Sequence, residues 1–119
     1  MILYRGGVNL PRKALETLTE SMFYVLMAFN HGAKCGIDVV DYIDRITHGR
    51  VQIGPATLYT ILGRFEKEKY IKEIKVDGRK RTYCITGKGI RAYEDELLRL
   101  KLCIDDAEGD LEAEGEDHE

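Results

Sequence analysis

The spacing of apolar residues along the chain predicts a series of helices that ends in a long C-terminal one. Between residues 15 and 30, apolar side chains recur in steps of three and four, with Thr17 or Thr19 available as N-cap. The segment 22–29, MFYVLMAF, is apolar on all sides, whereas a helix on a domain surface needs only one apolar stripe. We therefore expect this helix to be covered on two sides, the second cover being another copy of the chain.

Two further helices are predicted on either side of a short strand at 51–53. The first runs from about 37 to 47 and is followed by Gly49, a residue type favoured just past a helix end. The second covers 54–68, with a glycine N-cap and Pro55 in its first turn. Its buried face is predicted from apolar residues at i, i+3, i+4 and i+7, which are Leu58, Ile61, Leu62 and Phe65.

The opposite face of the helix at 54–68 is polar. It carries two threonines, a tyrosine and two basic residues, namely Thr57, Tyr59, Thr60, Arg64 and Lys67. Gly63 lies in the middle of this helix, where it costs about 1 kcal/mol relative to alanine. This cost suggests that something approaches the helix closely at Gly63.

A β-hairpin is predicted directly after this helix. The runs YIKEIKV and RTYCIT have β-like compositions and are separated by DGRK. Asp77-Gly78 is a typical two-residue turn, in which both central residues need positive φ. The tip and the returning strand carry three consecutive basic residues, Arg79, Lys80 and Arg81.

The last predicted helix covers 87–104, with Thr86 as its cap. Its apolar residues keep alternating three- and four-residue steps, at Ile90, Tyr93, Leu97, Leu100 and Ile104. Such a seam has little left to pack against in so small a chain. Residues 105–119 are acidic and poor in large apolar groups, and we expect them to be disordered.

Together these elements predict a mainly α fold with a small β-hairpin. Three helices followed by a two-stranded wing is the order of a winged helix-turn-helix domain, here assigned to 15–86. An N-terminal extension, 1–14, precedes it. A dimerisation helix, 87–104, and the acidic tail, 105–119, follow it.

Charge is unevenly distributed and changes what the net value implies. The formal net charge is −3, but nine acidic residues and no Lys or Arg lie in 105–119. The rest of the chain carries 18 basic and 12 acidic residues, and 54–91 alone carries ten basic and four acidic ones. The body of the protein is therefore basic, as expected for a partner of nucleic acid.

No pattern for catalysis or metal binding appears. The three cysteines and three histidines lack metal-ligand spacing, and we expect the thiols to be reduced and to serve as small apolar residues. Asp38, Asp41 and Asp44 recur every third residue, which allows a metal site but favours a solvated helix face. We expect no enzyme activity, no metal and no cofactor. Without a signal peptide or an apolar run long enough to span a membrane, the protein is expected in the cytoplasm.

The polar helix and the basic hairpin together predict binding to double-stranded DNA. The second helix of a helix-turn-helix pair enters the major groove, and the wing lies along the backbone or the next minor groove. Threonines near the helix start suit phosphates, Arg64 suits a guanine edge or a phosphate, and the hairpin cations suit phosphates. The predicted DNA-binding residues are Pro55, Ala56, Thr57, Tyr59, Thr60, Arg64, Lys67, Arg79, Lys80 and Arg81.

Three stretches of the sequence carry a family pattern: LTESMFYVLMAF, GPATLYTILGRFEKEKYI, which contains Ala56-Thr57-Leu58-Tyr59, and TYCITGKG. In these stretches the sequence resembles the PadR family of transcriptional regulators, in its short-chain subgroup with a single C-terminal helix. Ala56 replaces a usual glycine, and Cys35-Gly36-Ile37 replaces the usual His-Gly-Tyr. Lys69 also replaces a glycine, so we expect it to hold a left-handed conformation.

The resemblance implies a homodimeric repressor that binds a pseudo-palindromic operator, with release by a small aromatic ligand as a further expectation. The alternative is a dimeric winged-helix module that docks proteins without specific DNA binding. The predicted dimer interface comprises Met22, Val25, Phe29, Ile90, Tyr93, Leu97, Leu100 and Ile104. The predicted ligand residues are Phe23, Tyr24, Phe29 and Tyr93, which otherwise simply fill that interface. The tail either competes with DNA for the hairpin cations or only improves solubility; operator, regulated gene and ligand are left open.

Overall fold

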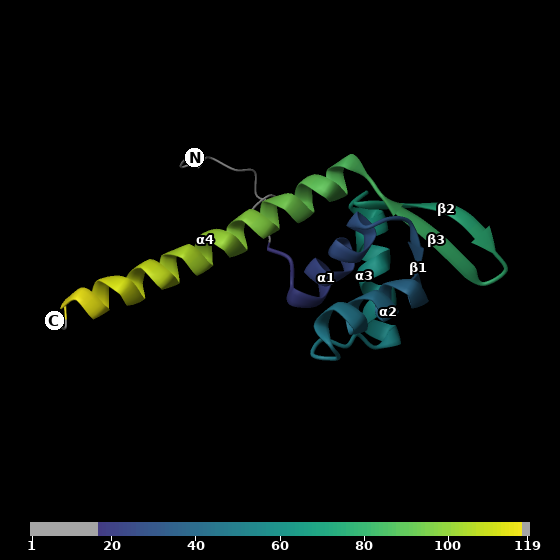
Figure 1. Ribbon diagram of the computed structural model, residues 1–119. Coiled ribbons are helices and arrows are strands. Elements are labelled where there is room, and N and C mark those ends of the chain that lie inside the picture. The colour runs from purple at the N-terminus through teal and green to yellow at the C-terminus, as the bar shows by residue number, and fades with distance from the viewer. Residues whose placement is uncertain (1–16, 118–119) are drawn as a thin grey trace.

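The computed structural model describes residues 17–117, with side chains described over 17–113, and has the predicted mainly helical architecture. The predicted extension at 1–14 lies outside the described residues. The elements follow one another as α1 (Glu20–Asn30), β1 (Lys34–Cys35), α2 (Gly36–Thr47), α3 (Pro55–Lys67), β2 (Ile71–Asp77), β3 (Lys80–Ile85) and α4 (Gly87–Asp117) (Figure 1). Three helices and a hairpin form a small domain, from which α4 projects.

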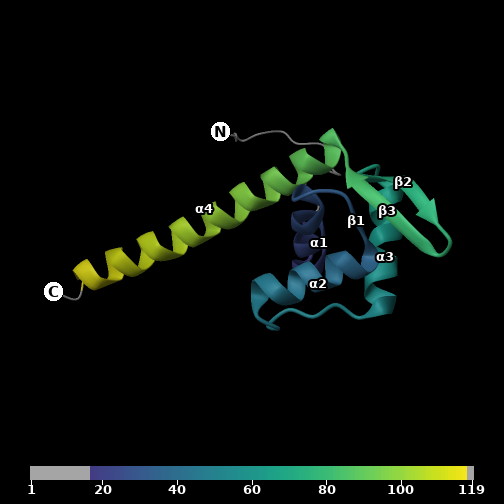
Figure 2. The ribbon, with the colours of Figure 1, turned by 45° about the vertical axis from the view of Figure 1, so that its right-hand side comes forward.

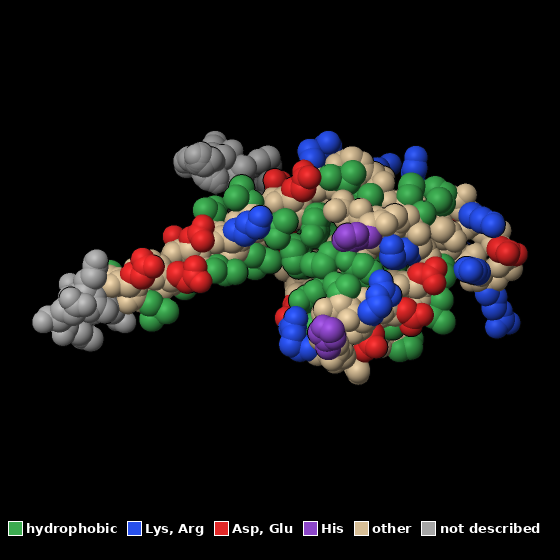
Figure 3. All heavy atoms as spheres, viewed as in Figure 1, with side chains coloured by type: hydrophobic (Ala, Val, Ile, Leu, Met, Phe, Trp, Pro, Cys, Tyr) green, Lys and Arg blue, Asp and Glu red, His purple; other side chains and the backbone are tan. Residues whose placement is uncertain are grey.

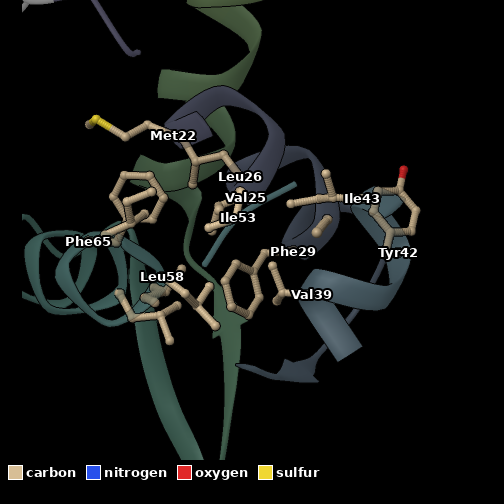
Figure 4. Packing of buried hydrophobic residues seen from close by; sticks show 14 of the residues in the cluster. Met22, Val25, Leu26, Phe29, Val39, Tyr42, Ile43, Ile53, Leu58 and Phe65 are labelled. Carbon is tan, nitrogen blue, oxygen red and sulfur yellow. The ribbon is translucent and has the colours of Figure 1, made fainter. Parts of the chain in front are cut away.

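Helix α1 is the centre of the core. It begins at the N-cap Thr19, whose hydroxyl accepts a hydrogen bond of 3.1 Å from the backbone amide of Met22. Its buried side chains meet those of α2, α3 and the hairpin in one cluster (Figure 4). The predicted buried face of α3 is confirmed, since Leu58, Ile61, Leu62 and Phe65 all lie in this cluster.

The uniform apolarity of α1 has a different cause from the one predicted. Val25 and Phe29 are 0% and 1% exposed, and Met22 is 7% exposed, within a single chain. The assignment of these three residues to a dimer interface is therefore wrong, because they have almost no surface left to offer. The second cover of α1 is this chain's own α4 and β3, which pack on it together with α2.

The segment 51–53 is not a strand, although its apolar residues are buried. Val51 and Ile53 fill the core from an irregular connection between α2 and α3. The backbone amide of Val51 donates a hydrogen bond of 3.1 Å to the hydroxyl of Thr47, a buried residue at the end of α2. The alternation of apolar residues thus reflects burial, while the backbone is satisfied by a side chain instead of a neighbouring strand.

The hairpin is present, with one additional strand and a different turn. The sheet order is β1-β3-β2, and the two-residue β1 pairs with β3 through Lys34 opposite Tyr83. The loop residues are Gly78 and Arg79, because Asp77 pairs with Lys80. Of these two loop residues only Gly78, with φ 66°, has positive φ, so the predicted pair of positive-φ residues at Asp77-Gly78 is wrong.

Helix α4 passes the predicted end at residue 104 and continues to Asp117, so it is roughly 46 Å long. The prediction of a disordered segment over 105–119 is therefore wrong for 105–117. Ala, Leu and Glu are strong helix formers and occupy many of these positions, which explains the continuation despite the glycines at 109 and 115. Figures 1 and 2 show α4 leaving the domain on the side opposite the hairpin.

Candidate nucleic-acid interface

The polar face of α3 is exposed as predicted. All seven predicted residues of this helix, from Pro55 to Lys67, are exposed, and Tyr59 is 71% exposed. The four apolar residues of α3 anchor its other face in the core, so the packing itself turns the polar face outward. The hydroxyl of Thr60 donates a hydrogen bond of 3.0 Å to the carbonyl oxygen of Ala56, which leaves the lone pairs of that hydroxyl available to a donor outside the helix.

The hairpin places three cations beside α3. Arg81 lies 3.6 Å from the carboxylate of Glu73 on the neighbouring strand, in a pair whose side chains are 61% and 31% exposed. Within the described residues, neither Arg79 nor Lys80 forms an ion pair. Figure 3 shows several Lys and Arg side chains around the hairpin end of the molecule, with Asp and Glu side chains between them. This end therefore has the charge and the exposed donors that phosphates require.

A cavity of about 860 Å³ lies between α2, α3 and the hairpin. It is lined by five of the predicted DNA-binding residues, Pro55, Tyr59, Arg79, Lys80 and Arg81. Sequence reasoning missed the other walls, which come from α2 and from further residues of α3, such as Ile37, Val40 and the exposed Glu66. No local pattern could have revealed this cavity, because its walls are contributed by segments more than 40 residues apart.

Tyr83 also lines this cavity and is 5% exposed. Burial raises the pKa of its hydroxyl, the carboxylate of Glu66 raises it further, and Arg81 acts in the opposite direction. The ring of Tyr83 packs edge-on against Phe29, with 6.2 Å between the ring centroids. Phe29 therefore belongs to the core, and its assignment as a ligand residue is wrong.

The other three predicted ligand residues do lie together, where α4 crosses α1. The rings of Phe23 and Tyr93 stack with 5.3 Å between centroids, and Tyr24 meets Phe23 edge-on at 6.1 Å. Burial raises the pKa of the Tyr93 hydroxyl. The Tyr24 hydroxyl accepts a hydrogen bond of 2.9 Å from the Arg50 side chain, so this cluster is tied to the loop before α3.

Helix α4 carries an apolar surface that the described chain does not cover. Ile104, a predicted interface residue, is 56% exposed, and the other four on this helix are partly buried. Leu98, Leu102 and Leu111 are 57%, 52% and 66% exposed. Figure 3 shows hydrophobic side chains along this helix and over the adjoining part of the domain.

A buried carboxylate lies on the same helix. Glu96 is only 7% exposed, and its two oxygens accept hydrogen bonds of 3.0 and 2.6 Å from the guanidinium of Arg99 one turn later. This paired carboxylate is satisfied within the helix.

The described residues contain no cluster of His, Cys, Asp and Glu that could hold a metal ion. Asp38, Asp41 and Asp44 lie on the exposed face of α2. The three cysteines are free, but only Cys35 is buried and Cys103 is exposed, so the expectation that all of them fill apolar sites is wrong for Cys103. Among the described helices, none is long and apolar enough to cross a membrane.

An outward-facing polar helix, an adjacent basic hairpin and a projecting apolar helix are together the anatomy of a winged-helix regulator. The model of the transcriptional regulator PadR-like family matches residues 25–95, more than half of the chain. This chain belongs to the PadR-like family. It is a DNA-binding transcriptional regulator and not an enzyme, as the sequence predicted.

Solved structures share this fold. A transcriptional regulator from Clostridium thermocellum is 27% identical, with a TM-score of 0.67, over 74% of this chain and 89% of its own. Bacillus subtilis PadR in complex with operator DNA is 19% identical, with a TM-score of 0.59, over 66% and 48%. Bordetella bronchiseptica BpsR, whose DNA binding is regulated by 6-hydroxynicotinic acid, is 23% identical, with a TM-score of 0.61, over 82% and 67%. No curated protein matches this chain.

Proposed function

We propose that this PadR-like regulator is a cytoplasmic homodimeric repressor that binds a pseudo-palindromic operator. The observation that carries the proposal is the exposed polar face of α3 beside the hairpin cations Arg79 and Lys80, which form no ion pair within the described residues. A helix of this kind fits the major groove, and cations at the hairpin tip reach the flanking backbone. The two-fold symmetry of a dimer then matches two half-sites about one helical turn apart.

The dimer is proposed to form through α4. Four of its apolar side chains project from the domain and remain exposed within one chain, namely Leu98, Leu102, Ile104 and Leu111. A second copy would cover them, since exposed apolar side chains of this size are stabilised by burial at about 25 cal/mol per Å². Ile90, Tyr93, Leu97 and Leu100 continue this surface towards the domain and remain partly exposed.

Selection of binding sites from random DNA, followed by gel shifts, tests the proposal. A half-site repeated with two-fold symmetry is expected. If Arg64 reads a base, Arg64→Ala should weaken the free energy of binding to the selected site by about 1–3 kcal/mol. Binding to unrelated DNA should be weakened by less. Arg79→Gln and Lys80→Gln should weaken binding to all DNA sequences alike. Each should also reduce the slope of log affinity against log salt concentration by about 1.

Lys101→Gln is the matched control, because it removes a cation from α4, away from the hairpin. This variant should leave the affinity for the selected site and the affinity for unrelated DNA unchanged. If selection enriches no sequence and the protein binds no upstream fragment at low salt, operator binding is refuted. The same polar helix and hairpin would then dock a protein partner.

A small aromatic effector is also proposed, at the cluster of Phe23, Tyr24 and Tyr93. The stacked rings of Phe23 and Tyr93 offer an apolar face, and the link from Tyr24 to Arg50 connects that face to the loop preceding α3. The regulation of BpsR by 6-hydroxynicotinic acid supports this kind of control. A melting-temperature screen of aromatic compounds on wild-type protein and Phe23→Leu tests it, and no shift with any compound would count against it.

A further inference from the structure

The cavity between α2, α3 and the hairpin has an apolar floor. Val40, Leu58, Leu62 and Ile53 line it from the core side, and all but Val40 are buried. At the rim, Ile37 is 69% exposed, which leaves a large apolar side chain in contact with water. A volume of about 860 Å³ lies in the range of small-molecule sites.

The rim of this cavity is positively charged. Its cations are Arg79, Lys80 and Arg81, and the only carboxylate among its lining residues is that of Glu66. Arg81 is partly neutralised by Glu73, whereas Arg79 and Lys80 have no ion-pair partner within the described residues. An apolar floor below these cations is complementary to a molecule with an apolar body and one negative end.

We propose that this cavity binds a small amphipathic carboxylate, with its apolar body against the exposed side chains of Ile37 and Tyr59 and its carboxylate towards Arg79 and Lys80. An Arg or Lys side chain is the natural partner of a carboxylate, and a partly desolvated pair is stronger than an exposed one. The site is separate from the aromatic cluster on α1 and α4.

The position of the cavity gives the ligand a consequence for regulation. Pro55, Tyr59 and the three hairpin cations line the cavity and are also the residues proposed to face DNA. A bound carboxylate neutralises cations that would otherwise contact phosphates, so ligand and DNA compete directly. This step, unlike the binding itself, rests on the proposed function.

Isothermal titration of the full chain with 2-naphthoate, in the absence of DNA, tests the binding. The neutral 2-naphthamide has nearly the same shape, and we expect it to bind at least about fivefold more weakly, because one charge interaction is lost. Replacing Arg79 and Lys80 together with glutamine should abolish this preference for the carboxylate. Lys75→Gln, on β2 outside the cavity lining, should preserve it.

Two further variants locate the ligand without disturbing the core. Ile37→Ser removes exposed apolar surface at the rim, and Gly63→Leu adds a side chain at a position where an added Cβ would meet no atom within 4 Å. Each should weaken 2-naphthoate binding by about fivefold or more. Ile74→Ser, a change of the same kind at a residue 52% exposed on β2, should not.

Three results would overturn the proposal: no binding of 2-naphthoate, equal binding of the amide, or binding unaffected by Ile37→Ser and Gly63→Leu. Competition is then measured as the loss of gel-shift affinity with added 2-naphthoate, with 2-naphthamide as control. If 2-naphthoate binds in the cavity but no DNA is bound specifically, the proposed function fails and the ligand site stands. If DNA is bound specifically and 2-naphthoate does not bind, the ligand site fails and the proposed function stands.

Discussion

The hydroxyl of Thr86 donates a hydrogen bond of 2.6 Å to the carbonyl oxygen of Lys69, across 17 positions of the sequence. The same hydroxyl accepts a bond of 3.1 Å from the backbone amide of Gly89 and so caps α4, as the sequence predicted. One side chain thus joins the end of α3 to the beginning of α4. A Cβ atom at Gly89 would overlap the carbonyl oxygen of Tyr70, which explains why a glycine stands there.

This junction makes Lys69 a strained position. Its φ of 65° confirms the expected left-handed conformation, which costs a residue with a Cβ roughly 1–2 kcal/mol. We predict that Lys69→Gly stabilises the protein, by about 0.5–1 kcal/mol after the greater entropy of glycine in the unfolded chain is subtracted. Urea unfolding at one fixed protein concentration measures the change.

Lys67→Gly is the control for this substitution, since Lys67 ends α3 in helical conformation. It should destabilise the protein by up to about 1 kcal/mol. A loss of stability in both variants would mean that the Lys69 side chain contributes more than its backbone strain costs.

A substitution of Gly63 tests whether a binding partner approaches α3 closely. An added Cβ there would meet no atom within 4 Å, so the expected close neighbour is not among the described residues. We predict that Gly63→Ala raises the free energy of unfolding by about 1 kcal/mol and leaves operator affinity within about twofold. Gly89→Ala should instead destabilise, because of its contact with Tyr70. A large loss of DNA affinity in Gly63→Ala would show that DNA approaches the helix at this point.

The exposed part of α4 allows the dimer to be tested without damage to the domain. Leu102 and Ile104 are 52% and 56% exposed, so aspartate at both positions should leave the fold intact. We predict that wild-type protein has twice the single-chain mass of 13.6 kDa at micromolar concentration, whereas the double variant has the single-chain mass. Light scattering measures the mass, and circular dichroism confirms that the variant is folded. Lys101→Asp, at an exposed neighbouring position, should remain dimeric.

The sequence predicted those elements whose pattern is local. The apolar steps of α3, the Thr86 cap and the strands of the hairpin depend on neighbours within a few residues, and all were placed correctly. The two-residue β1 was missed because it exists only through pairing with β3, almost 50 residues later. The burial of Val25 and Phe29 was assigned to a partner because sequence periodicity shows that a face is covered, but not by what.

In the candidate interface, too, only the features that depend on a local pattern could be predicted. The exposure of Tyr59 and Arg64 was predictable, since the apolar stripe of α3 dictates which side faces water. The cavity beside Tyr59 was not, because its walls combine α2, α3 and the hairpin. The acidic composition of 105–117 predicts disorder, yet composition alone does not separate a disordered segment from a solvated helix.

The helical state of 105–117 changes what the acidic end of the chain can do. As a flexible tail it would have a reach of roughly 20 Å and could visit the cations of its own hairpin. As part of α4 it is directed away from the hairpin, on the opposite side of the domain (Figures 1 and 2). At 0.1 M salt, charges separated by much more than about 10 Å are largely screened. Competition with DNA for Arg79 and Lys80 of the same chain is therefore not expected.

We accordingly predict that truncation after Ile104 leaves the ratio of specific to non-specific DNA affinity unchanged at about 0.1 M salt. Both affinities are measured by gel shift at protein concentrations where light scattering shows the truncated chain to be dimeric, because loss of Leu111 removes exposed apolar surface from α4. Replacing Asp105, Asp106 and Glu108 with Asn and Gln in the full chain is the matched control, since it removes charge but keeps the length. A truncated protein that gains non-specific affinity more than specific affinity would contradict this prediction. In that case the acids of one chain would have to meet the hairpin of the partner chain.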